Sequence, residues 1–365
     1  AAFTRRLPAE IPPLAEVRGL TWSDVGTGAG HEGFVIAGSG SGAAATMIAG
    51  VFAPTAGCMM GMGSVAEAAS KKIKPFTFAV LTDGHLYDIK DHRFDAMFMD
   101  AVNMVNKMSP APDMVIYAGD IGQSGLKSEL LKGKAMLDKL KMPYKVIPGE
   151  HDWYLDMGKA WRSLFGDENW SINHNGAHII GMNSIKIADF WTGPGLTNEE
   201  RMGRVLELEC NSCGPWGVEE DGLDWLEKDV KKVSPDTPII FFSHSPLWDY
   251  YPRWNFATKD APEIRGLLRK FDNVMAVHGH VHQVVFNKIG NISSVGTSST
   301  SWPWPYPPVD LPYPNIRHNR LDPGDFTDGM GGHHLSVAKD GSGTMYYDPF
   351  NPSAIPEAVK RGVKL

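Results

Sequence analysis

The chain has 365 residues, of which 42% are hydrophobic and 21% are charged, and its formal net charge is −7. This composition excludes intrinsic disorder, which requires fewer apolar residues, and three cysteines exclude a small fold held together by disulfides. The mildly acidic balance gives no support to binding through bulk attraction to phosphate, so nucleic acid is not an expected partner.

The first unusual feature along the chain is a segment, residues 33–66, that contains no Asp, Glu, Lys or Arg. It is long enough to cross a bilayer as a helix, although its many glycines dilute the apolar character. Together with Arg5-Arg6 upstream and Ala66-Glu67-Ala68 downstream, it resembles a twin-arginine export signal. We therefore expect an N-terminal arm at 1–32 and a signal-like or membrane-anchor segment at 33–70.

Two interpretations of this apolar N-terminal extension remain open. We favour an uncleaved membrane anchor, which predicts a membrane-associated protein on the periplasmic, extracytoplasmic face. The alternative is a Gly/Ala-rich arm that lies on a soluble domain or subunit. In the first case, residues 33–66 are a possible contact for membrane-protein partners.

After Lys74 the pattern changes to alternating strands and helices. Short apolar runs predict strands at 76–81, 114–118, 145–147, 177–181, 238–242 and 274–277. Helical patterns fall between them, at 93–108, 127–140, 218–233 and 262–271. This rhythm is typical of an α/β protein with parallel strands. Short strand patterns continue to Phe350 and predict a second, more antiparallel sheet.

Polar residues follow five of the predicted strands at the point where each strand ends. They are Asp83 and His85, Asp120, Glu150 and His151, His244, and His280 and His282. Open α/β sheets bind their ligands at the carboxyl ends of the strands. A lone histidine is usually structural, but carboxylates and imidazoles gathered at one sheet edge are typical ligands of divalent metals.

In this order and context, the motifs resemble those of the calcineurin-like metallophosphoesterase superfamily over roughly residues 75–350. The matching motifs are Asp83-Gly84-His85, Gly119-Asp120, Gly149-Glu150-His151-Asp152, His244 and Gly279-His280-Val281-His282. The resemblance implies a metallophosphoesterase domain at 71–350, followed by a tail at 351–365. The implied fold is a four-layer α/β sandwich of two mixed β-sheets flanked by helices.

The resemblance also implies a site with two metal ions (Mn, Fe or Zn). One metal would be held by Asp83, His85 and His282. The other metal would be held by Glu150, His244 and His280. Asp120 would bridge the two, and His151 would be catalytic, protonating the leaving oxygen. The implied reaction is hydrolysis of phosphomonoesters or small phosphodiesters by a metal-bridging hydroxide.

One residue departs from the family motif, because Glu150 stands where the family has Asn. A glutamate can still bind a metal, but it adds a negative charge. We expect tighter metal retention, a less electrophilic metal and weaker attraction for an anionic phosphate. This departure leaves two functions open. The chain is either a metallophosphoesterase or a non-catalytic or weakly active accessory subunit of a membrane assembly with the same fold and metal site.

Three further patterns give local predictions. Cys210 and Cys213 form a local disulfide in an exported domain, or else remain as two thiols. The Trp/Pro-rich loop at 302–314 either roofs the metal site or forms a docking surface for a partner protein. His333 and His334 begin a strand, in which one of the two should face inwards.

Overall fold

A computed structural model describes residues 73–186, 196–205, 216–250, 256–302 and 329–350. The predictions for the N-terminal arm, the apolar segment, the two cysteines, the 351–365 tail and the loop beyond Trp302 fall outside these residues. Within the described ranges, no helix combines the length and the apolar character needed to cross a bilayer. All the described residues belong to one of the two units into which the chain divides, Glu67–Leu365.

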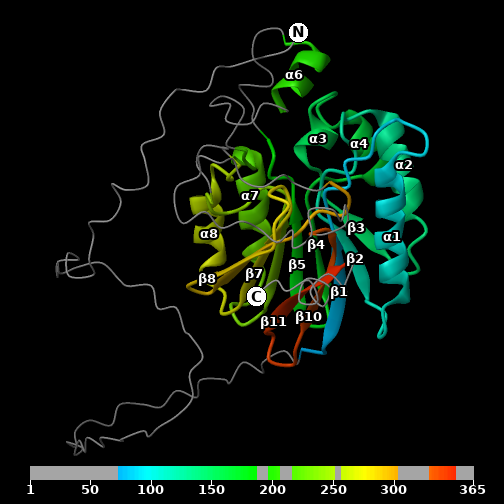
Figure 1. The fold of residues 1–365 in the computed structure, drawn as a ribbon. Helices are drawn as coiled ribbons and strands as arrows, with labels where there is room; N and C mark the ends of the chain where they lie inside the picture. Colours follow the sequence, from blue (N-terminus) through cyan, green and yellow to red (C-terminus); the bar gives the residue numbers. More distant parts are fainter. Residues whose placement is uncertain (1–72, 187–195, 206–215, 251–255, 303–328, 351–365) are drawn as a thin grey trace, which may run out of the picture. The chain divides into compact units, whose positions relative to one another are not determined.

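The first sheet has the strand order β11-β10-β1-β2-β3 (Figure 1). Strands β1 (Phe76–Leu81), β2 (Met114–Tyr117) and β3 (Tyr144–Val146) are parallel. Strand β10 (Gly331–Val337) pairs antiparallel with β1, and β11 (Gly343–Pro349) pairs antiparallel with β10. The prediction that the strands up to Phe350 form a second sheet was therefore wrong for β10 and β11, which extend the first sheet, whereas the strands at 285–289 and 292–296 do lie in the second.

The second sheet has the strand order β4-β5-β6-β7-β9-β8. Its strands are β4 (Trp170–His174), β5 (Ala177–Met182), β6 (Ile239–Ser243), β7 (Val274–His278), β8 (Val285–Ile289) and β9 (Ile292–Gly296). The four central strands are parallel, whereas β4 and β8 run antiparallel at the two edges. Both sheets are thus mixed, as predicted.

Each strand divides its apolar side chains between two cores, because alternate residues point to opposite faces. In β1, Phe76, Phe78 and Val80 belong to the core between the two sheets. Ala79 and Leu81 belong instead to the core beneath the helices. This alternation requires a covering layer on both sides of the sheet.

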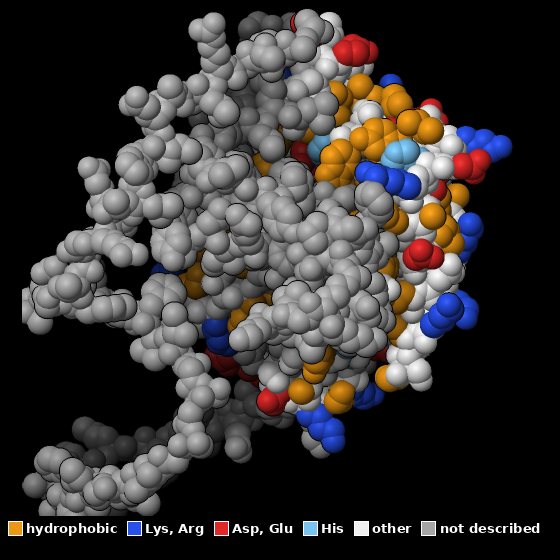
Figure 2. Space-filling model, viewed as in Figure 1, with side chains coloured by type: hydrophobic (Ala, Val, Ile, Leu, Met, Phe, Trp, Pro, Cys, Tyr) orange, Lys and Arg blue, Asp and Glu red, His pale blue; other side chains and the backbone are white. Residues whose placement is uncertain are grey.

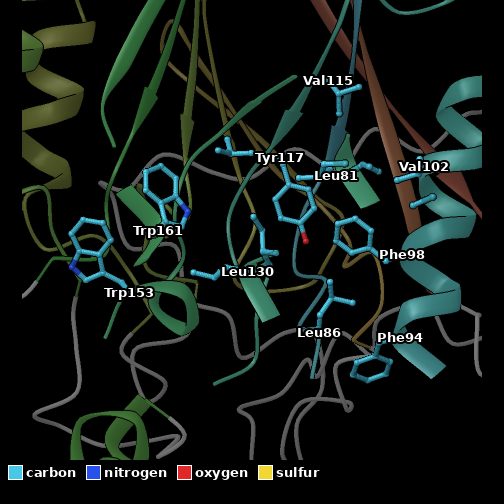
Figure 3. Close-up of a cluster of buried hydrophobic side chains, with 14 of the residues drawn as sticks. Leu81, Leu86, Phe94, Phe98, Val102, Val115, Tyr117, Leu130, Trp153 and Trp161 are labelled. Atoms are coloured by element: carbon cyan, nitrogen blue, oxygen red, sulfur yellow. The ribbon is translucent and has the colours of Figure 1, made fainter. Parts of the chain in front are cut away.

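Helices supply the two outer layers. On the first sheet lie α1 (Arg93–Lys107), α2 (Lys127–Leu137) and α4 (Lys159–Phe165), whose Phe98, Leu130 and Trp161 belong to one core. Figure 3 shows Phe98 of α1 beside Tyr117 and Leu81 of the sheet. On the second sheet lie α7 (Glu219–Val230) and α8 (Ala261–Leu268). The order helix, sheet, sheet, helix confirms the four-layer sandwich.

Helix α1 illustrates how the sequence determines this packing. The His92 side chain accepts a hydrogen bond from the Phe94 N–H at the start of the helix. Phe94, Phe98 and Val105 then recur at helical spacing and are buried. The outward surface is polar, and Figure 2 shows Lys and Arg side chains interspersed with Asp and Glu along the side where α1 and α2 lie.

Candidate metal centre

All eight residues predicted for the site lie just beyond the carboxyl ends of strands from both sheets. The first sheet contributes Asp83 and His85 after β1, Asp120 after β2, and Glu150 and His151 from the short helix α3 (Glu150–Trp153) after β3. The second sheet contributes His244 after β6, and His280 and His282 after β7. Every one of these side chains is buried.

The structure gathers these side chains into overlapping groups that could hold metal ions. One group contains Asp83, His85 and His282. A second group contains Asp120, Glu150, His244 and His280. A third group contains His85, Asp120 and His151. In each group the potential ligand atoms lie within 4.8 Å of one another. The first group brings together the three residues predicted for one metal, and the second brings together the three predicted for the other, with Asp120 among them.

Asp120 lies between the two groups. Its Oδ2 atom is 3.2 Å from His244 Nε2 and 3.7 Å from His85 Nε2. Its other oxygen, Oδ1, accepts a hydrogen bond of 3.0 Å from the His151 N–H. One carboxylate therefore contacts ligands of both groups and also fixes the start of α3.

Strained backbone turns direct several of these side chains into the site. Five residues have positive φ angles: Asp83 (54°), His85 (45°), Asp120 (55°), His280 (63°) and His282 (51°). This left-handed conformation is uncommon outside glycine and carries a free-energy cost of about 1–3 kcal/mol per residue. Its repetition at five candidate ligands indicates that the surrounding structure imposes a sharp turn directly after each strand.

Two glycines allow these loops to approach each other. Gly119 has a φ of +104°, and a Cβ atom there would lie 2.2 Å from His244 Nδ1. A Cβ atom on Gly149 would lie 1.9 Å from Asp120 Oδ1. Any larger residue at either position would displace a candidate ligand.

Backbone and side-chain oxygens fix the orientation of the imidazoles. His244 Nδ1 lies 2.7 Å from the carbonyl oxygen of Ala118, so its Nε2 atom faces the carboxylates. His85 Nδ1 lies 2.8 Å from the side-chain oxygen of Gln123, and His151 Nδ1 lies 2.6 Å from the backbone oxygen of the same residue. Such outer hydrogen bonds fix the tautomer of a metal-binding histidine.

Gln123 was not predicted from the sequence, although it lies in the loop that carries Asp120. The supporting role of Tyr117, at the end of β2, was not predicted either. Its buried hydroxyl accepts a hydrogen bond from the Gly84 N–H and donates one to the Asp120 carbonyl. Tyr117 thereby ties the β1 and β2 loops together. An aromatic residue at a strand end resembles any other core residue in sequence, so no pattern distinguished it.

Asp152 was part of the recognised motif, and the structure gives it a supporting role. Its two oxygens accept hydrogen bonds from the N–H groups of Gly122 and Gly149. Burial raises the pKa of Asp152 to about 6, although these hydrogen bonds act in the opposite direction. It therefore joins the loops after β2 and β3 and belongs to none of the three groups of candidate ligands.

The electrostatics of the site reflect three carboxylates buried among imidazoles. Burial, and then the neighbouring Glu150, raise the pKa of Asp120 well above its ordinary value. Burial acts against the charged form of Glu150 too, but His280 and His244 outweigh it and lower the pKa of Glu150. Burial alone would lower the pKa of His244, but Asp120 and Glu150 raise it well above its ordinary value. Three buried carboxylates this close together thus need protons or cations to balance their negative charge.

The donor set fits metal ions. Asp120 Oδ2, Glu150 Oε2 and His244 Nε2 are buried without a hydrogen-bond partner, yet they converge on one another. Unpaired buried polar atoms are costly, so their convergence requires an explanation. Carboxylate oxygens and imidazole nitrogens in this arrangement are suitable ligands for divalent metals. Glu150, the residue that departs from the family motif, is well placed within this set.

Aromatic rings border the cluster on two sides. The Trp302 ring lies 5.0 Å from the His85 ring and stacks near Tyr87 at 6.3 Å. The Phe256 and Trp216 rings lie 4.3 Å and 6.2 Å from the His280 ring. Trp302, the first residue of the Trp/Pro-rich loop, therefore lies beside the candidate metal ligands.

Comparison with known proteins gives a consistent result. A family model described as calcineurin-like phosphoesterase matches residues 76–284. The chain is 29% identical over 193 residues to a probable glycerophosphodiester phosphodiesterase of Arcobacter nitrofigilis, a match that covers 51% of this chain and 63% of the relative. That match spans less than two thirds of the relative's length. A 3′,5′-cyclic-nucleotide phosphodiesterase of Nostoc sp. is 20% identical over 236 residues, covering 62% of this chain and 79% of that protein.

A solved structure with the same fold is the purple acid phosphatase PPD1 from seeds of yellow lupin, Lupinus luteus. The TM-score is 0.53 at 11% sequence identity, and the match covers 77% of this chain and 52% of that one. At this identity the likeness concerns the fold alone. It agrees with the two mixed sheets and flanking helices described above.

Proposed function

Because this chain belongs to the calcineurin-like phosphoesterase family, we propose that it hydrolyses phosphate esters, phosphodiesters in particular, with two divalent metal ions. The observation that carries the proposal is the pair of ligand groups that meet at Asp120. The names of the two curated relatives support a phosphodiester substrate. Mn, Fe and Zn all suit this ligand set.

In this proposal Asp83, His85 and His282 hold one ion. Glu150, His244 and His280 would hold the other, and Asp120, which lies near ligands of both groups, would be available to each ion. When bound, the ions supply the Lewis acidity that activates water and offsets charge on the phosphoryl oxygens.

His151 has a separate role, which is to protonate the leaving oxygen. Its Nδ1 atom is occupied by the Gln123 carbonyl, which leaves Nε2 directed at the cluster, 4.0 Å from Glu150 Oε1. A histidine in this position can transfer a proton to a departing alkoxide, a contribution of about 10²–10⁴ in rate. The pKa of His151 is lowered from its ordinary value by burial, and Glu150 and the Gln123 carbonyl oppose this shift only in part.

The test combines metal analysis with two substrates, bis(p-nitrophenyl) phosphate and p-nitrophenyl phosphate. Asp120→Asn should lower the rate by about 10²-fold or more and reduce the metal content, because it weakens contacts to both groups. Asp113→Asn is a matched control. Asp113 also pairs with a histidine, His174 at 2.7 Å, but it precedes β2 at the opposite end of the strand. Metal-loaded wild-type protein that hydrolyses neither ester would overturn the proposal.

A further inference from the structure

Glu150 adds a third buried carboxylate to the candidate ligands, beside Asp83 and Asp120. We propose that Glu150 makes the site selective for singly charged phosphodiesters over doubly charged phosphomonoesters. This inference rests on the proposed function, since it concerns the substrate of the same site.

The geometry holds the Glu150 charge within the cluster. Its Oε1 atom is 2.9 Å from His280 Nδ1, and its Oε2 atom is 3.1 Å from His244 Nε2. The residue is only 4% exposed. Because an imidazole nitrogen lies about 3 Å from each oxygen, the carboxylate is directed at the second ligand group and not toward solvent.

Compared with an uncharged residue at position 150, Glu150 lowers the net charge of the site by one unit. With two divalent ions bound, the ionised carboxylates of Asp83, Asp120 and Glu150 would offset three of the four positive charges. The net charge of ions and ligands would then be one unit positive, whereas an uncharged Asn at position 150 would leave it two units positive. A phosphomonoester brings one more negative charge than a phosphodiester at neutral pH, so it gains more from each positive unit at the site.

The size of the effect follows from Coulomb's law. At a separation of about 5 Å and an effective dielectric constant of about 20, one extra unit charge changes the affinity on the order of 10²-fold. Glu150 should therefore weaken the binding of a dianion relative to a monoanion by at least about tenfold, allowing for screening by water and ions.

The other described neighbours of the cluster do not offset this charge. In the ranges that the structure covers, the ion pairs of Asp83, Asp120 and Glu150 are all with imidazoles. The rings of Trp302 and Phe256 lie beside the candidate ligands. Aromatic faces suit the organic group of an esterified oxygen better than a free, charged oxygen.

The experiment compares wild type with Glu150→Gln and Glu150→Asn in the full chain, each with saturating Mn²⁺ and verified metal content. Calorimetry at pH 8 measures the affinity for inorganic phosphate, a dianion, and for dimethyl phosphate, a monoanion. Both variants should gain at least about tenfold in phosphate affinity relative to dimethyl phosphate. Glu227→Gln, on the exposed surface of α7, is the matched control and should not change this ratio.

Hydrolysis provides the second measurement. The ratio of kcat/KM for bis(p-nitrophenyl) phosphate to that for p-nitrophenyl phosphate should fall about tenfold or more in the Glu150 variants. An unchanged phosphate-to-dimethyl-phosphate ratio in metal-loaded variants would overturn the role of Glu150, even if the wild type hydrolyses both esters. Conversely, a wild type inert to both esters refutes the proposed function, while the calorimetric ratio still decides whether Glu150 selects by charge.

Discussion

Gln123→Leu removes a hydrogen bond that orients a candidate metal ligand. The side-chain oxygen of Gln123 accepts from His85 Nδ1 at 2.8 Å, in a place where the glutamine is only 7% exposed. Leucine leaves this buried N–H without an acceptor, at a cost of about 1–3 kcal/mol. Since about 1.4 kcal/mol corresponds to a factor of ten, the metal affinity of the first group should fall roughly 10–100-fold.

Competition with a chromophoric chelator measures this affinity directly. At saturating metal the rate should change far less, because the backbone carbonyl that holds His151 remains. Gln123→Glu keeps an acceptor at the same position and should restore most of the affinity. As a control, Asn106→Leu removes two side-chain hydrogen bonds between α1 and residues 139–141, away from the cluster. Equal metal affinity in Gln123→Leu and wild type would refute this role for Gln123.

Three further predictions concern catalysis, packing and pH. His151→Gln should lower the hydrolysis of alkyl phosphodiesters by about 10²–10⁴-fold but that of p-nitrophenyl esters much less, because nitrophenolate leaves without a proton; equal losses would contradict the assignment. Gly149→Ala should reduce metal affinity, since its Cβ would lie 1.9 Å from Asp120 Oδ1, whereas Gly266→Ala in α8, with nothing within 4 Å, should leave it unchanged. His333 is buried and burial lowers its pKa to about 3, so the unfolded chain binds a proton below about pH 6.5 that the folded protein does not. The free energy of unfolding therefore falls as the pH falls, by about 2 kcal/mol at pH 5 from His333 alone. In His333→Leu, the free energy of unfolding measured with urea should lack this part of the pH dependence.

The residues that the sequence suggested as metal ligands lie together in the structure. Asp83, Asp120 and His244 each follow a short, mostly apolar run, and such runs identify buried parallel strands whose carboxyl ends meet at one edge. The sequence also predicted that one of His333 and His334 would face inwards, without saying which. The structure buries His333 and leaves His334 partly exposed.

The supporting contacts could not be predicted, because they depend on pairings between distant segments. Strand β10 joins β1 across most of the length of the domain, and no local pattern specifies that partner. The Thr300 hydroxyl accepts a hydrogen bond from the Thr82 N–H and thereby fixes the end of β1, yet Thr300 lies in an ordinary Ser/Thr run. Gln123 acquires its role only once β1 and β3 lie on either side of β2.

The candidate ligands come from both sheets, and this has a mechanical consequence. An ion held by Asp83, His85 and His282 would join the end of β1 to the end of β7, and Asp120 with His244 would join β2 to β6 in the same way. Such an ion cross-links segments far apart in the sequence and restrains the chain as a long closed loop. Chelation would therefore remove this restraint at the carboxyl ends of the strands, while the apolar core between the sheets and the cores beneath the helices remain.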